Sequence, residues 1–190
     1  AHDNVPALQR QAAEQRGTTA DQVYPTETFS STWSESIGDE TVQLRHYGAA
    51  HTGGDAVIHF ERANVAHVGD LVFNRVYPFI DIDGGASSRG WIGTLEQIHA
   101  DLDDDTRIIF GHGHPEYGIV GHRADLLAMR DFLDGLVTYV QDGIAAGTSL
   151  EELADRQVLP GFEAHHLADW PLQLSACIRA VHRDLTGSAG

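Results

Sequence analysis

Three short segments of the sequence place a side chain that commonly binds metal ions directly beside glycine. The segments are 50–55 (AHTGGD), 67–70 (HVGD) and 110–113 (FGHG). Their candidate ligands are His51, Asp70 and His112, and imidazole and carboxylate groups are both good ligands for zinc. Glycine lets the backbone and a bound ion approach closely. Together the three segments predict a zinc site that is assembled from separate parts of the chain.

Each of these signals is weak when it stands alone. A histidine at the end of a strand is more often solvated or hydrogen-bonded than bound to a metal, and a Gly-Asp pair is usually only a turn. The sequence contains 12 histidines, and most of them have no ligand-like neighbours. The order and the context of His51, Asp70 and His112 favour metal binding over these alternatives.

The elements that must position these residues can be predicted from periodicity and turn signals. Strands are expected at 41–47, 56–60, 64–68 and 107–110, and helices at 5–16, about 88–102, 124–146 and 169 to about 185. The segment 18–38 is expected to be a polar connection. Each candidate ligand would lie at the end of a strand, which holds a side chain rigidly. This order of elements predicts a mixed α/β sandwich.

The same segments resemble the metal motifs of a known family. The run 50–55 resembles the third metal motif of the metallo-β-lactamase superfamily, 67–73 (HVGDLVF) resembles the fourth, and 108–113 (IIFGHG) resembles the fifth. The run 77–85 (YPFIDIDGG) and the helix after it are similar to a bacterial branch of this superfamily. The resemblance extends from Ala1 to about Asp155, and it is specific because order, spacing and flanking residues agree.

The resemblance implies a fold and a site. The fold class would be α/β (α+β), a four-layer αββα metallo-β-lactamase sandwich that forms a single domain over residues 1–190, with a C-terminal helical extension from about residue 123. His51 would serve a first metal ion and His112 a second, and Asp70 would bridge the two ions, usually zinc, as the catalytic residue. A metal-bound hydroxide would attack the substrate, which implies a hydrolase of ester, lactone, lactam or thioester bonds.

One motif of the superfamily is absent from the sequence. The signature H-x-H-x-D-H, which normally supplies two ligands to each metal, does not occur, and the run 1–5 (AHDNV) resembles the segment just after it. The sandwich is therefore expected to be incomplete at the N-terminus, and His2 is not expected to be a ligand. One or two zinc ions are conceivable, including a single ion held by His51, Asp70 and His112 with water in the fourth position.

The alternative is a truncated, non-catalytic fragment of such a hydrolase, which binds metal weakly or not at all. A fragment of this kind would expose sheet edges and apolar faces. Association into a homodimer or a higher oligomer is then expected, because unpaired edges and apolar faces favour contact with a second chain.

Other residues have both a structural and a functional interpretation. Tyr77 and Phe79 follow the bridging aspartate and would either contact the substrate or pack in the core. His114 belongs to the only H-x-H in the sequence, and it is expected at the mouth of the site rather than as a ligand. His165 and His166 are adjacent, so their side chains should diverge, and neither is expected to bind metal.

Composition and charge restrict the classes of partner. The formal net charge is −16, with 12 Lys and Arg against 28 Asp and Glu, so neither nucleic acid nor an acidic membrane surface is an expected partner. No apolar run approaches the roughly 18 residues of a membrane span. The expected partner is a small-molecule substrate. The compartment stays open, although relatives in this branch are often exported, which favours the periplasm.

Overall fold

The computed structural model describes residues 1–187, and its centre is one sheet of six strands in sequential order. The strands are β1 (Thr32–Ile37), β2 (Glu40–Arg45), β3 (Val57–Phe60), β4 (Val65–Asn74), β5 (Arg107–Gly113) and β6 (Val120–Gly121). Neighbouring strands are antiparallel except β4 and β5, which are parallel and are connected through the helix α2 (Ser88–Asp101). A parallel pair requires a crossover of this kind.

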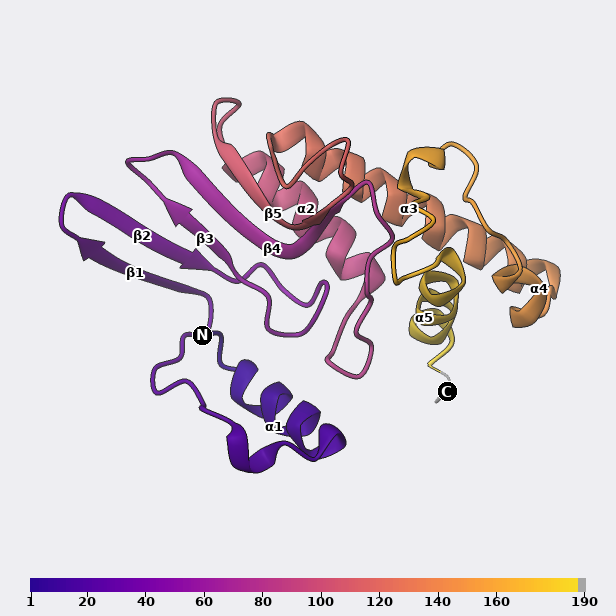
Figure 1. Cartoon of the computed structure of the whole chain (residues 1–190), viewed down its shortest axis with the longest axis horizontal. Helices are drawn as coiled ribbons and strands as arrows, with labels where there is room; N and C mark the ends of the chain where they lie inside the picture. The colour runs from indigo at the N-terminus through magenta and orange to yellow at the C-terminus, as the bar shows by residue number, and fades with distance from the viewer. Residues whose placement is uncertain (188–190) are drawn as a thin grey trace.

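Helices cover one face of the sheet. α2 and the long α3 (Arg123–Ala146) lie behind β4 and β5 (Figure 1). The buried core includes the strand residues Val57, Ala66, Val68 and Ile108 and the helix residues Leu95, Ile98, Leu133 and Leu136. Burial of a large apolar side chain contributes about 1.5–3 kcal/mol, so this layer stabilises the strands that carry the candidate ligands.

The remaining helices lie away from this layer. α1 (Val5–Arg16) and the 3-10 turn η1 (Thr19–Asp21) precede β1 and lie below the sheet in Figure 1. α4 (Leu150–Ala154), the 3-10 turn η2 (Glu163–His165) and α5 (Leu174–Thr186) follow α3. α5 packs against both α3 and α4. No helix within residues 1–187 is long and apolar enough to cross a membrane.

The opposite face of the sheet carries apolar side chains, and no helix layer formed by residues 1–187 covers it. The register pairs Val42 with Phe60 and Leu44 with Ile58, and strand alternation places these four side chains on the face away from Val57. The predicted mixed α/β class is confirmed. Of the four predicted layers, residues 1–187 form one sheet and the helices on one of its faces.

Most predicted elements are confirmed, and two strands, β1 and the short β6, were missed. The helices expected at 5–16, about 88–102 and 124–146 correspond to α1, α2 and α3. The prediction that 18–38 is a connection is wrong, because this segment contains β1. β1 is an edge strand in which every residue except Trp33 is exposed, so its sequence lacks the alternation of apolar and polar residues that marks a half-buried strand.

Candidate metal centre

Asp70 lies in β4, directly after a break in the regular pairing with β5. The register shifts on both sides of Gly69, whose φ of 53° is a left-handed conformation that favours glycine. Bulges of this kind redirect the side chains next to them. Gly111 of β5 passes so close that a Cβ would overlap the Oδ1 atom of Asp70 and would lie 2.8 Å from the carbonyl carbon of Gly69. The position of the carboxylate therefore requires glycine on both strands.

His51 lies in the loop between β2 and β3, where a carboxylate orients its ring. Nδ1 of His51 is 3.3 Å from Oδ1 of Asp55. A carboxylate only accepts hydrogen bonds, so this contact places the proton on Nδ1 and leaves the lone pair of Nε2 free. The backbone N–H and the hydroxyl of Thr52 donate to the Asp55 carboxylate at 2.7 and 2.9 Å and fix it in turn. Nε2 of His51 is thus available for a ligand bond.

The loop around His51 is attached to the beginning of α2. The backbone N–H of Ser87 donates to the carbonyl of Ala50 at 3.0 Å. A Cβ on Gly90, in the first turn of α2, would overlap the carbonyl oxygen of Ala49. The close approach of helix and loop therefore requires glycine at position 90, and it holds the His51 loop against a regular element.

His112 lies near the end of β5 and is positioned by aromatic contacts. Its ring stacks on Phe73 of β4 with the centroids 4.8 Å apart, and Trp170 meets it edge to face at 5.5 Å. Trp170 comes from the segment between η2 and α5, and its indole N–H donates to the carbonyl of Tyr77 at 2.8 Å. Packing thus orients His112, whereas a hydrogen bond orients His51.

The Asp70 carboxylate presents one oxygen to each imidazole. Its Oδ2 is 3.9 Å from Nε2 of His51, and its Oδ1 is 3.5 Å from Nε2 of His112. Two ligands of one tetrahedral zinc ion, each about 2.0–2.2 Å from the metal, are roughly 3.3–3.6 Å apart. The donor types of both pairs therefore fit zinc, and Asp70 is common to the two pairs. The spacing of Asp70 and His112 lies within this range, whereas that of Asp70 and His51 is wider by about 0.3 Å.

The three side chains form two pairs rather than one closed shell. Within residues 1–187, no three His, Cys, Asp or Glu side chains are arranged as a group that could hold a single ion. The hypothesis of one ion bound by His51, Asp70 and His112 together is thus less well supported than two half-sites that share Asp70. Each half-site would need further donors. A structural zinc ion in a protein usually has four protein ligands, and a catalytic zinc ion usually has three protein ligands and a water.

The structure brings the three predicted ligands together, although not at three strand ends. His112 is the second-last residue of β5, whereas Asp70 lies within β4 and His51 lies in a loop. The prediction of a strand end is therefore wrong for His51 and Asp70. A bulge at Gly69 redirects the side chain of Asp70, and a hydrogen-bonded loop fixes that of His51. Strand periodicity in the sequence reveals neither the bulge nor the loop.

The predicted substrate-contacting residues lie in different environments. Tyr77 is completely buried, and burial raises the pKa of its hydroxyl to about 12. Of the two interpretations of Tyr77, substrate contact or packing in the core, its burial therefore favours packing. Phe79 is 50% exposed, and its ring centroid is 6.4 Å from that of His51, so it borders the candidate centre. His114 lies in the turn after β5 and packs edge to face on Tyr117 at 5.5 Å.

Two contributors to the centre were not singled out from the sequence. The first is Asp55, which orients His51, and the signal that could have found it is the spacing of four residues within AHTGGD. The second is Trp170, which the structure places against His112. No local pattern could have predicted that contact, because the two residues lie in distant parts of the chain.

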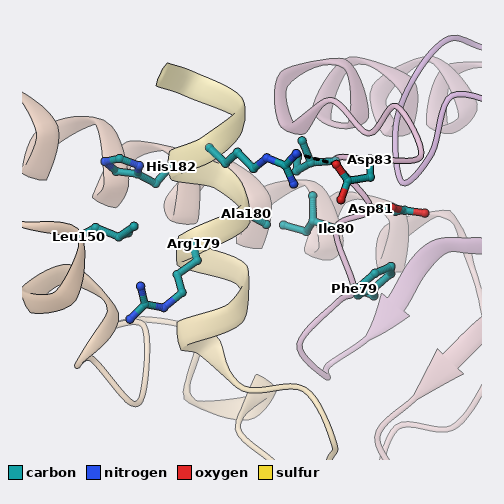
Figure 2. Close-up of a pocket in the computed structure, with 10 residues that line it drawn as sticks. Phe79, Ile80, Asp81, Asp83, Leu150, Arg179, Ala180 and His182 are labelled. Atoms are coloured by element: carbon teal, nitrogen blue, oxygen red, sulfur yellow. Dashed lines mark hydrogen bonds and ion pairs between the residues drawn. The ribbon is translucent and has the colours of Figure 1, made fainter. Parts of the chain in front are cut away.

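A groove of about 470 Å³ lies between the loop 79–83 and α5 (Figure 2). Its lining is mainly apolar, with charged side chains at the edge: Phe79, Ile80, Asp81, Ile82, Asp83, Leu150, Arg179, Ala180, His182 and Arg183. Arg183 is tied to Asp83 at 2.5 Å, whereas the half-exposed Arg179 makes a looser pair with Glu151 at 3.6 Å. Phe79 belongs to both the groove and the border of the candidate centre, so the two are adjacent.

A model of the metallo-beta-lactamase superfamily matches residues 3–114. The match covers more than half of the 190 residues and includes His51, Asp70 and His112. The chain belongs to the metallo-beta-lactamase superfamily. The resemblance seen in the three motifs is thereby confirmed. α3, Trp170 and the later helices lie beyond the matched residues.

Solved structures share the fold. A double mutant of the sec-alkylsulfatase PisA1 aligns with a TM-score of 0.68 and 18% identity over 87% of this chain and 27% of that chain. The sec-alkylsulfatase Pisa1 from Pseudomonas sp. aligns with a TM-score of 0.66 and 19% identity over the same shares. A metallo-beta-lactamase from Pontibacter korlensis aligns with a TM-score of 0.51 and 18% identity over 67% of this chain and 61% of that chain.

The chain thus spans about a quarter of the length of the alkylsulfatase chains that it resembles. At these identities the likeness is evidence for the fold alone. None of the curated proteins matches the chain.

Proposed function

We propose that the chain carries the metal site of a zinc-dependent hydrolase that cleaves an ester, lactone, lactam or thioester bond. The observation that carries the proposal is the Asp70 carboxylate with the Nε2 atom of one imidazole beside each of its oxygens. Membership of the superfamily supports it. When bound, zinc supplies Lewis acidity and activates water for attack.

The residues of the chain have separate tasks in this proposal. His51, Asp70 and His112 are the ligands, and the charge of Asp70 offsets part of the charge of the ions. Asp55 keeps the proton of His51 on Nδ1, so that Nε2 faces Asp70 as a ligand. Trp170 limits the movement of the His112 ring through an edge-to-face contact.

A calorimetric zinc titration of the metal-stripped chain tests the site. Wild type is expected to bind at least one zinc ion with sub-micromolar affinity. Asp70→Asn preserves the shape of the side chain and removes its charge, so affinity is expected to fall at least about 100-fold, more than for loss of an outer partner of a ligand. Asp105→Asn, in the exposed turn before β5, is the matched control and should bind as wild type does. Equal affinity in Asp70→Asn and wild type would refute the site.

Activity measurements then separate catalysis from binding. The substrates are a β-lactam, a homoserine lactone, a glutathione thioester and a p-nitrophenyl ester. The proposal is supported if the wild-type chain turns over a substrate, if chelation abolishes this turnover and zinc restores it, and if Asp70→Asn shows no turnover. Zinc binding without turnover of any substrate supports the alternative, in which the chain is a non-catalytic fragment of such a hydrolase.

The uncovered sheet face leads us to propose self-association as well. Leu44, Ile58 and Phe60 share this face and are only half-buried in the single chain. A second copy that covers them would remove apolar surface from water. Light scattering at high protein concentration is expected to show a dimer or a larger species, and a monomer would contradict this expectation.

The groove favours a second candidate bond class, the alkyl sulfate ester. Its apolar wall of Phe79, Ile80 and Leu150 could receive an alkyl chain that extends from the candidate centre. Ala180→Leu would narrow the groove. The variant is expected to raise the KM for long-chain alkyl sulfates and to leave that for short-chain ones unchanged. Absence of alkyl sulfate hydrolysis by the zinc-loaded chain would exclude this candidate.

A further inference from the structure

His165 is a buried imidazole without a hydrogen-bond partner. It is 3% exposed and stacks on Phe132, with the ring centroids 4.4 Å apart and the planes at 15°. Phe162 meets it edge to face at 5.8 Å. Neither Nδ1 nor Nε2 has a hydrogen-bond partner among residues 1–187. An unpaired buried polar atom costs about 1–3 kcal/mol, and such atoms in native proteins commonly mark a bound water, ion or ligand.

His165 is one of the residues that line a cavity of about 210 Å³ beside α3. The lining residues are Arg75, Ala128, Asp131, Gly161, Phe162, Ala164 and His165. Asp131, Gly161 and Ala164 are exposed and form the rim, whereas His165 lies at the base. A ligand can therefore enter the cavity from solvent. Both ring nitrogens of His165 are closed to solvent, so a ligand must displace part of the cavity wall to contact them. The volume suits a molecule of several non-hydrogen atoms, because a water in the liquid takes about 30 Å³.

Arg75 brings a positive charge to the same cavity from a strained position. Its φ of 57° is rare for residues other than glycine and costs on the order of 1 kcal/mol or more. One guanidinium nitrogen donates to the side chain of Asn74 at 3.1 Å, and another lies 3.7 Å from the carboxylate of Asp125. A guanidinium has five N–H groups, so these contacts leave donors for a further acceptor.

The charges around the cavity favour an anion. Asp131 is the one acidic residue among the lining residues, and its carboxylate pairs with Arg130 at 2.7 Å. Burial and then the nearby charge of Arg75 lower the pKa of His165 to about 4. The ring is therefore neutral near pH 7 and carries one N–H donor. The cavity thus offers one positive charge, from Arg75, and one neutral N–H donor, from His165. This combination suits an anion with a single negative charge better than one with two.

We propose that this cavity binds a small organic carboxylate, whose oxygens accept hydrogen bonds from the guanidinium of Arg75 and from the imidazole N–H of His165. The planar guanidinium matches the geometry of a carboxylate, and charge-assisted hydrogen bonds of this kind are the strong ones. The ligand would supply the partner that His165 lacks. None of the three candidate zinc ligands takes part, so this site does not depend on the proposed hydrolase function.

Acetate is the probe, and the ring resonances of His165 in the full chain report its binding by NMR. Acetate is expected to shift these resonances in a saturable manner. Arg75→Gln removes the charge, and His165→Phe removes both nitrogens but preserves the stacking on Phe132. Both variants are expected to bind acetate at least tenfold more weakly. His166→Phe alters the exposed neighbour and is the matched control, with wild-type affinity expected.

Each outcome decides for or against the site. Saturable binding that Arg75→Gln weakens supports the proposal even where His165→Phe does not fold. The proposal would be overturned if acetate did not shift the His165 resonances, or if wild type and Arg75→Gln bound acetate with equal affinity. Water would then be the occupant of the cavity. Tighter binding of inorganic phosphate than of acetate would overturn the carboxylate assignment. Asp70→Asn is expected to bind acetate as wild type does, which separates this cavity from the candidate metal centre.

Discussion

His112 and His165 each stack on a phenylalanine ring, at centroid distances of 4.8 and 4.4 Å, but their polar surroundings differ. His112 is exposed, and its Nε2 is 3.5 Å from a carboxylate oxygen of Asp70. His165 is buried, and the charge that acts on it comes from the guanidinium of Arg75. Aromatic packing positions both rings, so packing alone does not decide what an imidazole does.

The difference lies in the sign of the neighbouring charge and in access to solvent. A carboxylate beside an accessible imidazole creates a negative site that attracts a cation. A guanidinium beside a buried imidazole keeps the ring neutral and attracts an anion. The first arrangement lies in the region matched by the superfamily model, whereas His165 lies beyond residue 114. The following variants test this comparison, from the largest expected effect to the smallest.

Gly111→Ala should disturb the carboxylate that faces His112. A Cβ there would overlap Oδ1 of Asp70 and lie 2.8 Å from the carbonyl carbon of Gly69, so the two strands must separate. We expect a loss of about 3 kcal/mol in the free energy of unfolding and loss of zinc binding, measured by urea denaturation and calorimetry. Gly93→Ala in α2 is the control, because its Cβ meets nothing within 4 Å. An equal effect at both positions would contradict the steric argument.

His165 should make the stability depend on pH. Its pKa is about 4 in the folded chain, against 6.5 for an ordinary histidine. Between these values the unfolded chain binds a proton that the folded chain does not, so stability is complete above about pH 6.5 and falls as the pH drops toward 4. The loss is about 3 kcal/mol, at about 1.4 kcal/mol per pKa unit.

Urea denaturation at pH 7 and pH 4.5 measures this loss. His165→Phe should lack the His165 contribution, because phenylalanine does not titrate. His166→Phe should retain the wild-type dependence, because that ring is exposed. If the two variants respond to pH alike, the contrast between the buried ring and the accessible rings is wrong.

Asp55→Asn should weaken zinc binding through the orientation of His51. The amide can donate to Nδ1, which moves the proton to Nε2 and blocks the atom that faces Asp70. Removal of such an outer partner typically weakens metal binding by about 10–100-fold. Calorimetry measures the change, and Asp142→Asn on the exposed side of α3 should bind zinc as wild type does. An unchanged affinity in Asp55→Asn would show that the hydrogen bond does not set the tautomer.

Trp170→Leu should have the smallest effect. It removes the edge contact with His112, which is worth about 1 kcal/mol in aromatic pairs, so zinc affinity is expected to fall about fivefold. Trp33→Leu removes a partly exposed indole from the edge strand β1 and serves as the control. A fall of the same size in both variants would exclude a specific role for Trp170 at His112.

The sequence could predict much of the fold because its signals are local. Capping residues, glycine and 3.6-residue periodicity mark α1, α2 and α3 within their own segments. The glycine-flanked ligand types at 51, 70 and 112 are likewise visible in short runs, and their order identifies the superfamily. β1 escaped detection because an exposed edge strand buries no alternate side chains, so its sequence lacks the alternation that marks a half-buried strand.

The sequence by itself therefore determined the superfamily, the main elements and the three candidate ligands. Only the tertiary structure decided that Asp70 faces both imidazoles, that Trp170 reaches His112, and that Arg75 and His165 line one cavity. Those relations join residues from distant segments. They depend on how strands and helices pack in three dimensions, and a linear pattern records the residue types but not the contacts that packing creates.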